Sequence, residues 1–262
     1  MSRIYYIINI MKVAVCFWGL TRSLKYTIDS INKYIFDIFK KNNIEFRVFM
    51  HTYSVFEKYN NSWANEKNIV LDNEEYKLLN PDYLSIDNQE QVKSSIDFLQ
   101  YRTQADPWCN NYETMNNFIL AMYSKKQLLK LFLDNDDGTY THFLMIRPDV
   151  RYLNSFDIKW LSTIKNNEIY VPGFGLFGYG GGSNGFNDRM AFTKDKKIFI
   201  IYNKLFDQCL DFSRKAPLHS ETINKYNMII RNIKITFIPF YFNRVRANGV
   251  NEIDVKFSKI KK

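Results

Sequence analysis

Carboxylates and arginines are spaced along this chain in positions that suit chemistry on a phosphorylated substrate. Asp149 stands between Arg147 and Arg151, directly after the apolar run at 142–146. An aspartate can hold a divalent cation or a sugar hydroxyl, and guanidinium groups bind phosphate oxygens through paired hydrogen bonds. This segment therefore predicts a site for a sugar nucleotide.

Two further carboxylates are candidates for proton transfer. Asp188 ends a glycine-rich segment, and Glu221 follows Ser220, which is placed to cap a helix. Each has an ordinary structural alternative, because Asp188 can pair with Arg189 and a glutamate in a first helical turn is favoured by the helix dipole. We favour Glu221 as general base, since a helix start is a rigid mount, and Asp188 as a group that grips sugar hydroxyls.

Five more residues are candidates for binding the nucleotide. Gly19 and Arg22 follow the first apolar run, where Arg22 either reaches a phosphate or lies on the surface. His51, at the end of the second run, either packs internally or contacts the base. Arg244 and Arg246 alternate in strand register and face one side, as phosphate ligands or as a solvated basic edge.

The apolar pattern predicts the elements that position these residues. Short apolar runs at 12–19, 46–53 and 142–147 are typical of buried parallel strands. Helical spacing over 21–42 and 111–133 predicts two amphipathic helices. The order strand, helix, strand at the start of the chain indicates a βαβ unit, as in nucleotide-binding half folds.

The remaining elements are shorter. We expect short helices and loops over 55–112, beside the site, and a glycine-rich loop over 173–189. That loop lacks the sequence of a phosphate-binding loop or a dinucleotide fingerprint, so we expect it to fold against a ligand. The other predicted elements are strands at 169–172, 190–193 and 233–240 and helices at 198–209 and from Ser220.

Taken in order, these motifs resemble those of a GT-A glycosyltransferase. The run 13–19 resembles the nucleotide-binding first strand, and Arg147-Pro148-Asp149 stands where such enzymes carry Asp-x-Asp. The segment 186–192 resembles the one by which capsule, lipopolysaccharide and giant-virus transferases approach the sugar. His219-Ser220-Glu221 resembles the acidic motif that opens the acceptor-side helix.

The resemblance implies an α/β fold with a GT-A-like, Rossmann-type central mixed sheet flanked by helices. It implies one domain over 1–262, with a nucleotide-binding half at about 11–150 and an acceptor half at about 151–250. The implied reaction moves a sugar from a nucleoside-diphosphate sugar, such as a UDP-sugar, to a glycan or other hydroxyl acceptor. A general base favours an inverting displacement.

The resemblance leaves open whether a metal ion or arginine side chains neutralise the charge on the leaving diphosphate. Related enzymes use Mn²⁺ or Mg²⁺, but Arg147 replaces the first aspartate of the motif and leaves Asp149 as the one metal-binding carboxylate. Mg²⁺ commonly takes one or two carboxylates plus phosphate oxygens, which keeps a metal site at Asp149 open. Arg244 and Arg246, where metal-using members often carry a histidine, can instead neutralise the diphosphate directly.

Charge patterning weighs against two other classes of protein. The net charge is +9, but the lysines are scattered and the one dense cluster is at 256–262. A nucleic-acid- or polysaccharide-binding basic module needs clustered basic residues interleaved with aromatic ones. A nucleotidyltransferase needs a longer glycine- and lysine-rich loop than the one at 19–22.

The location of the protein also follows from its composition. Cys16, Cys109 and Cys209 lack metal-ligand spacing and indicate a reducing compartment. Polar residues interrupt the apolar stretch 4–20, so no membrane span is predicted. We expect a cytoplasmic protein, in the host cytoplasm if the AT-rich composition reflects a large DNA virus. Its expected partners are a nucleotide sugar and a carbohydrate acceptor, and no nucleic acid.

Overall fold

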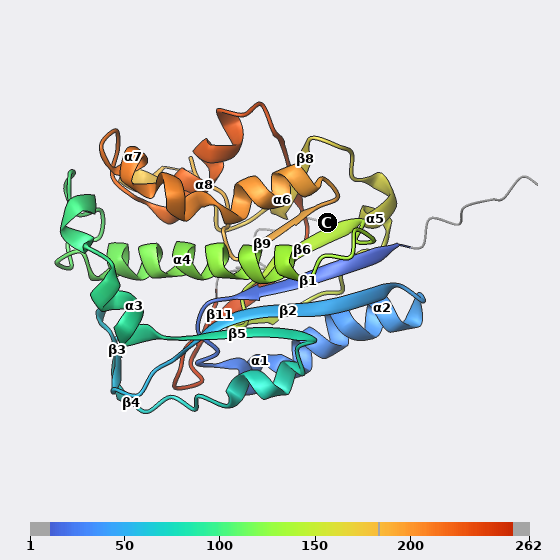
Figure 1. The fold of residues 1–262 in the computed structure, drawn as a ribbon, viewed down its shortest axis with the longest axis horizontal. Coiled ribbons are helices and arrows are strands. Elements are labelled where there is room, and N and C mark those ends of the chain that lie inside the picture. The colour runs from blue at the N-terminus through green and yellow to red at the C-terminus, as the bar shows by residue number, and fades with distance from the viewer. Residues whose placement is uncertain (1–10, 183, 254–262) are drawn as a thin grey trace, which may run out of the picture.

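A seven-stranded mixed sheet forms the centre of the computed structural model, which describes residues 11–182 and 184–253 (Figure 1). The strand order is β10-β8-β9-β6-β1-β2-β5, and all strands are parallel except β9, which is antiparallel to both neighbours. This is the predicted α/β, Rossmann-like class. The strands are β1 (Lys12–Trp18), β2 (Glu45–Ser54), β5 (Tyr83–Asn88), β6 (His142–Ile146), β8 (Glu168–Pro172), β9 (Met190–Thr193) and β10 (Lys234–Ile238).

Helices cover both faces of this sheet. Figure 1 shows α1 and α2 on one face and α4, α6 and α8 on the other. The π-helical segment Asn32–Phe36 joins α1 to α2, so the predicted first helix is continuous from Leu24 to Lys41. The predicted helix 198–209 is shorter than expected and breaks at Asn203. The helices are α1 (Leu24–Ile31), α2 (Asp37–Lys41), α3 (Gln89–Ser95), α4 (Glu113–Asp134), α5 (Lys159–Thr163), α6 (Lys196–Asn203), α7 (Cys209–Ser213) and α8 (Ser220–Ile229).

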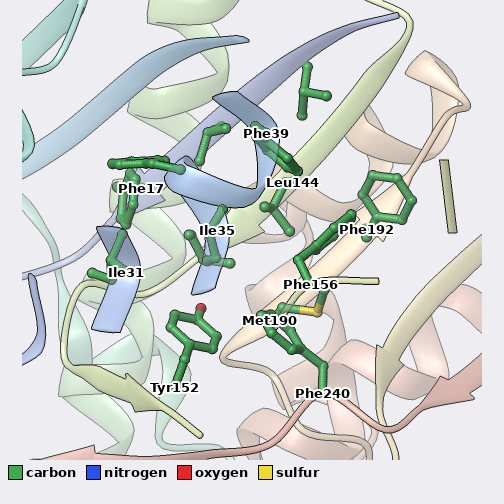
Figure 2. Close-up of a cluster of buried hydrophobic side chains, with 14 of the residues drawn as sticks. Phe17, Ile31, Ile35, Phe39, Leu144, Tyr152, Phe156, Met190, Phe192 and Phe240 are labelled. Carbon is green, nitrogen blue, oxygen red and sulfur yellow. The ribbon is translucent and has the colours of Figure 1, made fainter. Parts of the chain in front are cut away.

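The central strands are buried on both faces. In β1, Val13, Val15 and Phe17 belong to the apolar cluster on the α1 side, while the alternate residues belong to the cluster beneath α4 and α6. Figure 2 shows Phe17 close to Ile31 of α1, and Leu144 near Phe39 and Phe156 in the same apolar layer. Packing on both faces holds β1 and β6 rigidly, and with them the residues that follow each strand.

The described residues also form two smaller sheets. β7 (Val150–Tyr152), β11 (Phe242–Val245) and β12 (Asn251–Glu252) form one, and β3 (Tyr59–Asn61) and β4 (Glu66–Ile69) form a hairpin. Segment 55–112, predicted as short helices and loops, thus contains three strands, and β5 is the edge strand of the main sheet. The side chains of β5 are partly buried or exposed, so its sequence needs no continuous apolar run, and it was not recognised as a strand.

The lysine cluster 256–262 and the first part of the apolar stretch 4–20, residues 4–10, lie outside the described residues. Within the ranges 11–182 and 184–253, no helix combines the length and apolar character needed to cross a membrane.

Candidate functional site

A cavity of about 490 Å³ opens at the end of the sheet where β1 and β6 terminate. Its volume lies in the usual range for small-molecule sites, roughly 300–1,000 Å³. All the predicted site residues except His51 line it: Gly19, Arg22, Arg147, Asp149, Asp188, Glu221, Arg244 and Arg246.

Strand pairing explains why residues far apart in sequence meet here. β6 and β9 are antiparallel and pair Ile146 with Met190, so the residue after one strand faces the residue before the other. The Arg147 amide accordingly donates to the Arg189 carbonyl at 3.0 Å. β7 and β11 are also antiparallel, and the Val245 amide donates to the Asp149 carbonyl at 2.9 Å. This pairing brings the segment that carries Arg244 and Arg246 next to Asp149.

Asp149 is buried between two guanidinium groups. Arg147 Nε donates to Oδ1 at 2.8 Å, and Arg22 Nη2 donates to Oδ2 at 3.1 Å. Burial alone raises the pKa of this carboxyl, but the charges of Arg147 and Arg22 outweigh burial and hold the pKa well below its usual range. Asp149 is therefore ionised at neutral pH and fixes the two arginines at the cavity wall.

The donor set around Asp149 suits an anion better than a divalent cation. Both carboxylate oxygens already accept hydrogen bonds from guanidinium groups. Within the described part of the chain, no group of three or more His, Cys, Asp or Glu side chains is placed to hold a metal ion. The Asp149 oxygens that would bind the Mn²⁺ or Mg²⁺ implied by the Asp-x-Asp resemblance are engaged by Arg147 and Arg22 in this structure.

Positive charge predominates in the cavity lining, where five arginines face three carboxylates. Arg22 also contacts the Tyr59 hydroxyl, and Arg246 Nε donates to Glu252 Oε1 at 2.6 Å. Arg22 and Arg189 each keep a solvent-shielded Nε without a hydrogen-bond partner in the described structure. Asp188 Oδ1, beside Arg189, is likewise without a hydrogen-bond partner there, so the unmatched donor that favours an anionic ligand is that of Arg22.

Asp188, just before β9, and Glu221, in the first turn of α8, form a pair of buried carboxylates that line the cavity. Arg189 Nη1 lies 3.4 Å from Asp188 Oδ1 and 3.6 Å from Glu221 Oε1, and the Ser220 hydroxyl donates to Asp188. Burial raises the pKa of Glu221 to about 7, and the negative charge of Asp188 adds to the rise. For Asp188, burial is outweighed by Arg189 and Arg147, and its pKa is lowered. Glu221 is thus the member of the pair that titrates near neutral pH.

The glycine-rich loop is packed directly against the start of α8. The Phe186 amide donates to the Glu221 carbonyl at 3.2 Å, and the Tyr179 amide donates to Thr222 Oγ1 at 3.0 Å. A Cβ atom on Gly185 would lie 1.9 Å from the Phe177 carbonyl oxygen and 2.6 Å from Glu221 Cβ. Only glycine permits this approach, which fixes the loop next to Glu221.

His51 does not line the cavity, and the structure assigns it the packed alternative rather than contact with a base. It is fully buried, with Nδ1 2.7 Å from Ser124 Oγ and Nε2 3.2 Å from Asp87 Oδ2. Ser124 also accepts the Gly19 amide at 2.8 Å, where Gly19 has a φ of +92°. His51 therefore supports the turn after β1 from behind.

The sequence predicted that segment 55–112 lies beside the site, but it identified none of the cavity-lining residues that the structure shows between 53 and 121. The wall that they form carries aromatic, amide and small side chains but no charged one, whereas the rest of the lining carries all the arginines and carboxylates. No motif signalled it, because its members come from separate short elements. They are Tyr53, Tyr59, Asn61, Trp63, Gln89, Pro107, Trp108, Thr114, Asn117, Phe118, Leu120 and Ala121.

Lys125 was also missed and lies fully buried behind the cavity on α4. Its ammonium lies 3.8 Å from the ring centre of Tyr202 and 4.5 Å from that of Trp18, and donates to Asn224 Oδ1 at 3.3 Å. Burial lowers its pKa to about 7, against the opposing charge of Asp188. Its position in a predicted amphipathic helix gave no signal, because a lysine there is ordinarily exposed.

Comparison with known proteins adds no assignment, because the chain matches no protein-family model and no curated protein. Any function proposed for it rests on the geometry and chemistry of the cavity.

Proposed function

We propose that this protein is a sugar-nucleotide-dependent glycosyltransferase of the GT-A type that acts by inversion. The observation that carries the proposal is one cavity that holds both an arginine cluster and a buried carboxylate pair with one member titrating near neutrality. Glycosyl transfer from a nucleoside diphosphate needs both parts: cations for the leaving group and a base for the acceptor.

The arginines supply the donor site. Arg22 and Arg147, held by Asp149, and Arg244 beside them, present guanidinium groups that match the oxygens of a diphosphate. Their positive charge stabilises the charge that develops on the departing nucleoside diphosphate. No step of this proposal requires a metal ion.

Glu221 supplies the base. The acceptor oxygen forms a bond to the anomeric carbon while the bond from that carbon to the β-phosphate oxygen breaks. The electron pair of the broken bond leaves with the nucleoside diphosphate, and Glu221 takes the acceptor proton. A carboxylate with a pKa of about 7 is well matched to this task near neutral pH. Asp188, ionised and held by Ser220, fixes Arg189 and grips sugar hydroxyls.

Turnover with a panel of UDP-, GDP- and dTDP-sugars tests the proposal, using mixed neutral oligosaccharides as acceptors and mass spectrometry of the products. We expect one donor class to be consumed with formation of a glycosylated acceptor. Glu221→Gln should lower this rate by about a hundredfold, the usual contribution of a general base. Absence of transfer from every donor, with and without Mn²⁺, would contradict the proposal.

A further inference from the structure

Exposed aromatic side chains stand beside the proposed base. Phe177 is 56% exposed and Tyr179 is 48% exposed, and both line the cavity. Their backbone lies against Glu221 and Thr222, through the close approach at Gly185 and the amide of Tyr179. Trp108 stacks on His219 at 5.4 Å, and His219 Nδ1 is 3.7 Å from Glu221 Oε2. Glu221, Phe177 and Tyr179 therefore line the same cavity, with the backbone of the two aromatic residues against the start of α8.

Close contacts and hydrogen bonds constrain the described part of the loop that carries Phe177 and Tyr179. A Cβ atom on Gly178, between the two aromatic residues, would lie 2.7 Å from the Asn184 amide nitrogen. The Asn187 side-chain amide donates to the Phe174 carbonyl at 3.3 Å, which ties the two ends of the loop together. Large apolar rings that a fixed loop presents to a cavity, outside the apolar core, mark a binding surface.

The charge around Glu221 selects the kind of ligand. Two carboxylates, Asp188 and Glu221, share contacts with one guanidinium, that of Arg189. Arg22 and Arg147 instead contact Asp149, and Arg246 contacts Glu252. The charges of Arg147 and Lys125 also act on Asp188, and that of Arg244 acts on Glu221. A phosphate or carboxylate on the acceptor that approached Glu221 would nevertheless be repelled by two neighbouring carboxylates. A neutral ligand carries no such cost.

We propose that Phe177 and Tyr179 form the acceptor site and bind a neutral pyranose ring, rather than a phosphorylated or acidic acceptor. A pyranose presents a face of C–H groups that packs on an aromatic ring, while its hydroxyls project from the ring edge. Packed in this way, one hydroxyl reaches Glu221. This inference rests on the proposed function, because Glu221 is the base only in that reaction, and it names the acceptor class of the same site.

Direct binding measurements test the inference without a known acceptor. The probes are the neutral disaccharides lactose, maltose and cellobiose, and the anionic sugars glucose 6-phosphate and glucuronate, measured by saturation-transfer NMR. The variants are the double substitution Phe177→Ala with Tyr179→Ala, and Phe177→Leu with Tyr179→Leu, which keeps apolar bulk without flat rings. Phe56→Ala is the matched control, since Phe56 is 76% exposed and does not line the cavity.

We expect at least one neutral disaccharide to bind through its C–H face and to bind at least about tenfold more weakly to both double variants, a loss typical of removing aromatic anchors. Binding to Phe56→Ala should match the unsubstituted protein. The inference is overturned if no neutral disaccharide binds, if the anionic sugars bind better, or if the leucine variant binds as the unsubstituted protein does. Titration with UDP, GDP and dTDP tests the donor site separately, so failure of the proposed function is distinguishable from failure of the acceptor site.

Discussion

At the scale of single residues, the site is organised by carboxylates that differ in their surroundings. Asp149 is surrounded by guanidinium groups and stays ionised, whereas burial and Asp188 raise the pKa of Glu221. The same residue type thus serves two purposes. One carboxylate orients arginines, and the other is free to exchange a proton near neutral pH.

Replacing Asp149 should weaken the fold as well as the site. Asp149→Asn removes the charge that pairs with the buried side chain of Arg22 and with the partly exposed Arg147, and leaves Arg22 with Glu66 alone. Removal of one partner of a buried ion pair costs about 3–5 kcal/mol. We expect urea denaturation to show a loss of this order and transfer activity to fall below detection. Asp29→Asn, at an exposed position, is the control and should change stability by less than about 0.5 kcal/mol. An Asp149→Asn variant as stable as the control would remove the structural role assigned to this ion pair.

Glu221→Gln should lower the transfer rate about a hundredfold and yet stabilise the protein above neutral pH. The pKa of Glu221 is raised from 4.5 to about 7 in the folded chain, so the folded state binds more protons than the unfolded state between these values. Stability contributed by this group is complete below about pH 4.5 and is lost as the pH rises through about 7. We therefore expect the variant to have a higher Tm than the unsubstituted protein at about pH 8, and a similar Tm at about pH 4.5.

Activity should follow the same titration. Since the base must be deprotonated, kcat/KM should rise as the pH increases through about 7 and then level off. Asp188→Asn is the comparison, and we expect it to raise KM rather than to abolish turnover. If Asp188→Asn abolishes turnover and Glu221→Gln is nearly silent, the base is Asp188.

At the scale of elements, the apolar runs were sufficient to predict the central strands and the long helix, because β1 and β6 are buried on both faces and α4 has one buried stripe. The same pattern did not show β5, whose residues are half-buried at the sheet edge. Nor did it show that His51 is bound by Ser124 and Asp87, which lie on other elements. Local patterns report burial along one segment, whereas contacts between segments depend on the complete fold.

The packing of the glycine-rich loop on α8 can be tested by adding one methyl group. Gly185→Ala places a Cβ within van der Waals overlap of Phe177 and Glu221, so the loop must move away from the helix. We expect a loss of about 1–3 kcal/mol in stability, typical of overpacking, and at least a tenfold loss of transfer activity. Gly173→Ala, in the same loop with nearest atoms at 3.5 Å, is the matched control and should be nearly neutral. Equal effects of the two substitutions would show that loop packing does not position Glu221.

At the scale of the whole molecule, strands from both predicted halves share one sheet, and the cavity lies at the edge where they meet. The charged residues of the cavity were largely predictable, because strand ends and a helix start carry conspicuous charges. The segment 55–112 was expected beside the site, but the residues of the uncharged wall at 53–121 could not be identified, because they come from many short segments. The structure shows, as the sequence could not, that five arginines line the same cavity.

The arginines predict that activity is largely independent of divalent metal. Asp149 is occupied by guanidinium groups, and Arg22 and Arg147 provide the charge that a cation would otherwise supply. We expect transfer in EDTA to stay within about threefold of the rate with Mn²⁺, a difference under about 0.7 kcal/mol in the barrier. Complete loss in EDTA with recovery in Mn²⁺ would show that Asp149 exchanges its arginine partners for an ion when the donor binds.

Calorimetric titration with UDP, GDP and dTDP in EDTA tests the central claim most directly. We predict that one of these binds with a Kd in the micromolar range, and that Arg147→Gln weakens binding at least about tenfold, the loss expected for a charge-assisted contact. Arg151→Gln should have no effect on binding. Arg151 lies only two residues after Asp149, but it does not line the cavity and it donates to the Tyr26 carbonyl. Failure of all three nucleotides to bind, with or without Mn²⁺, or equal binding to the two arginine variants, would contradict the assignment of this cavity to a nucleoside diphosphate.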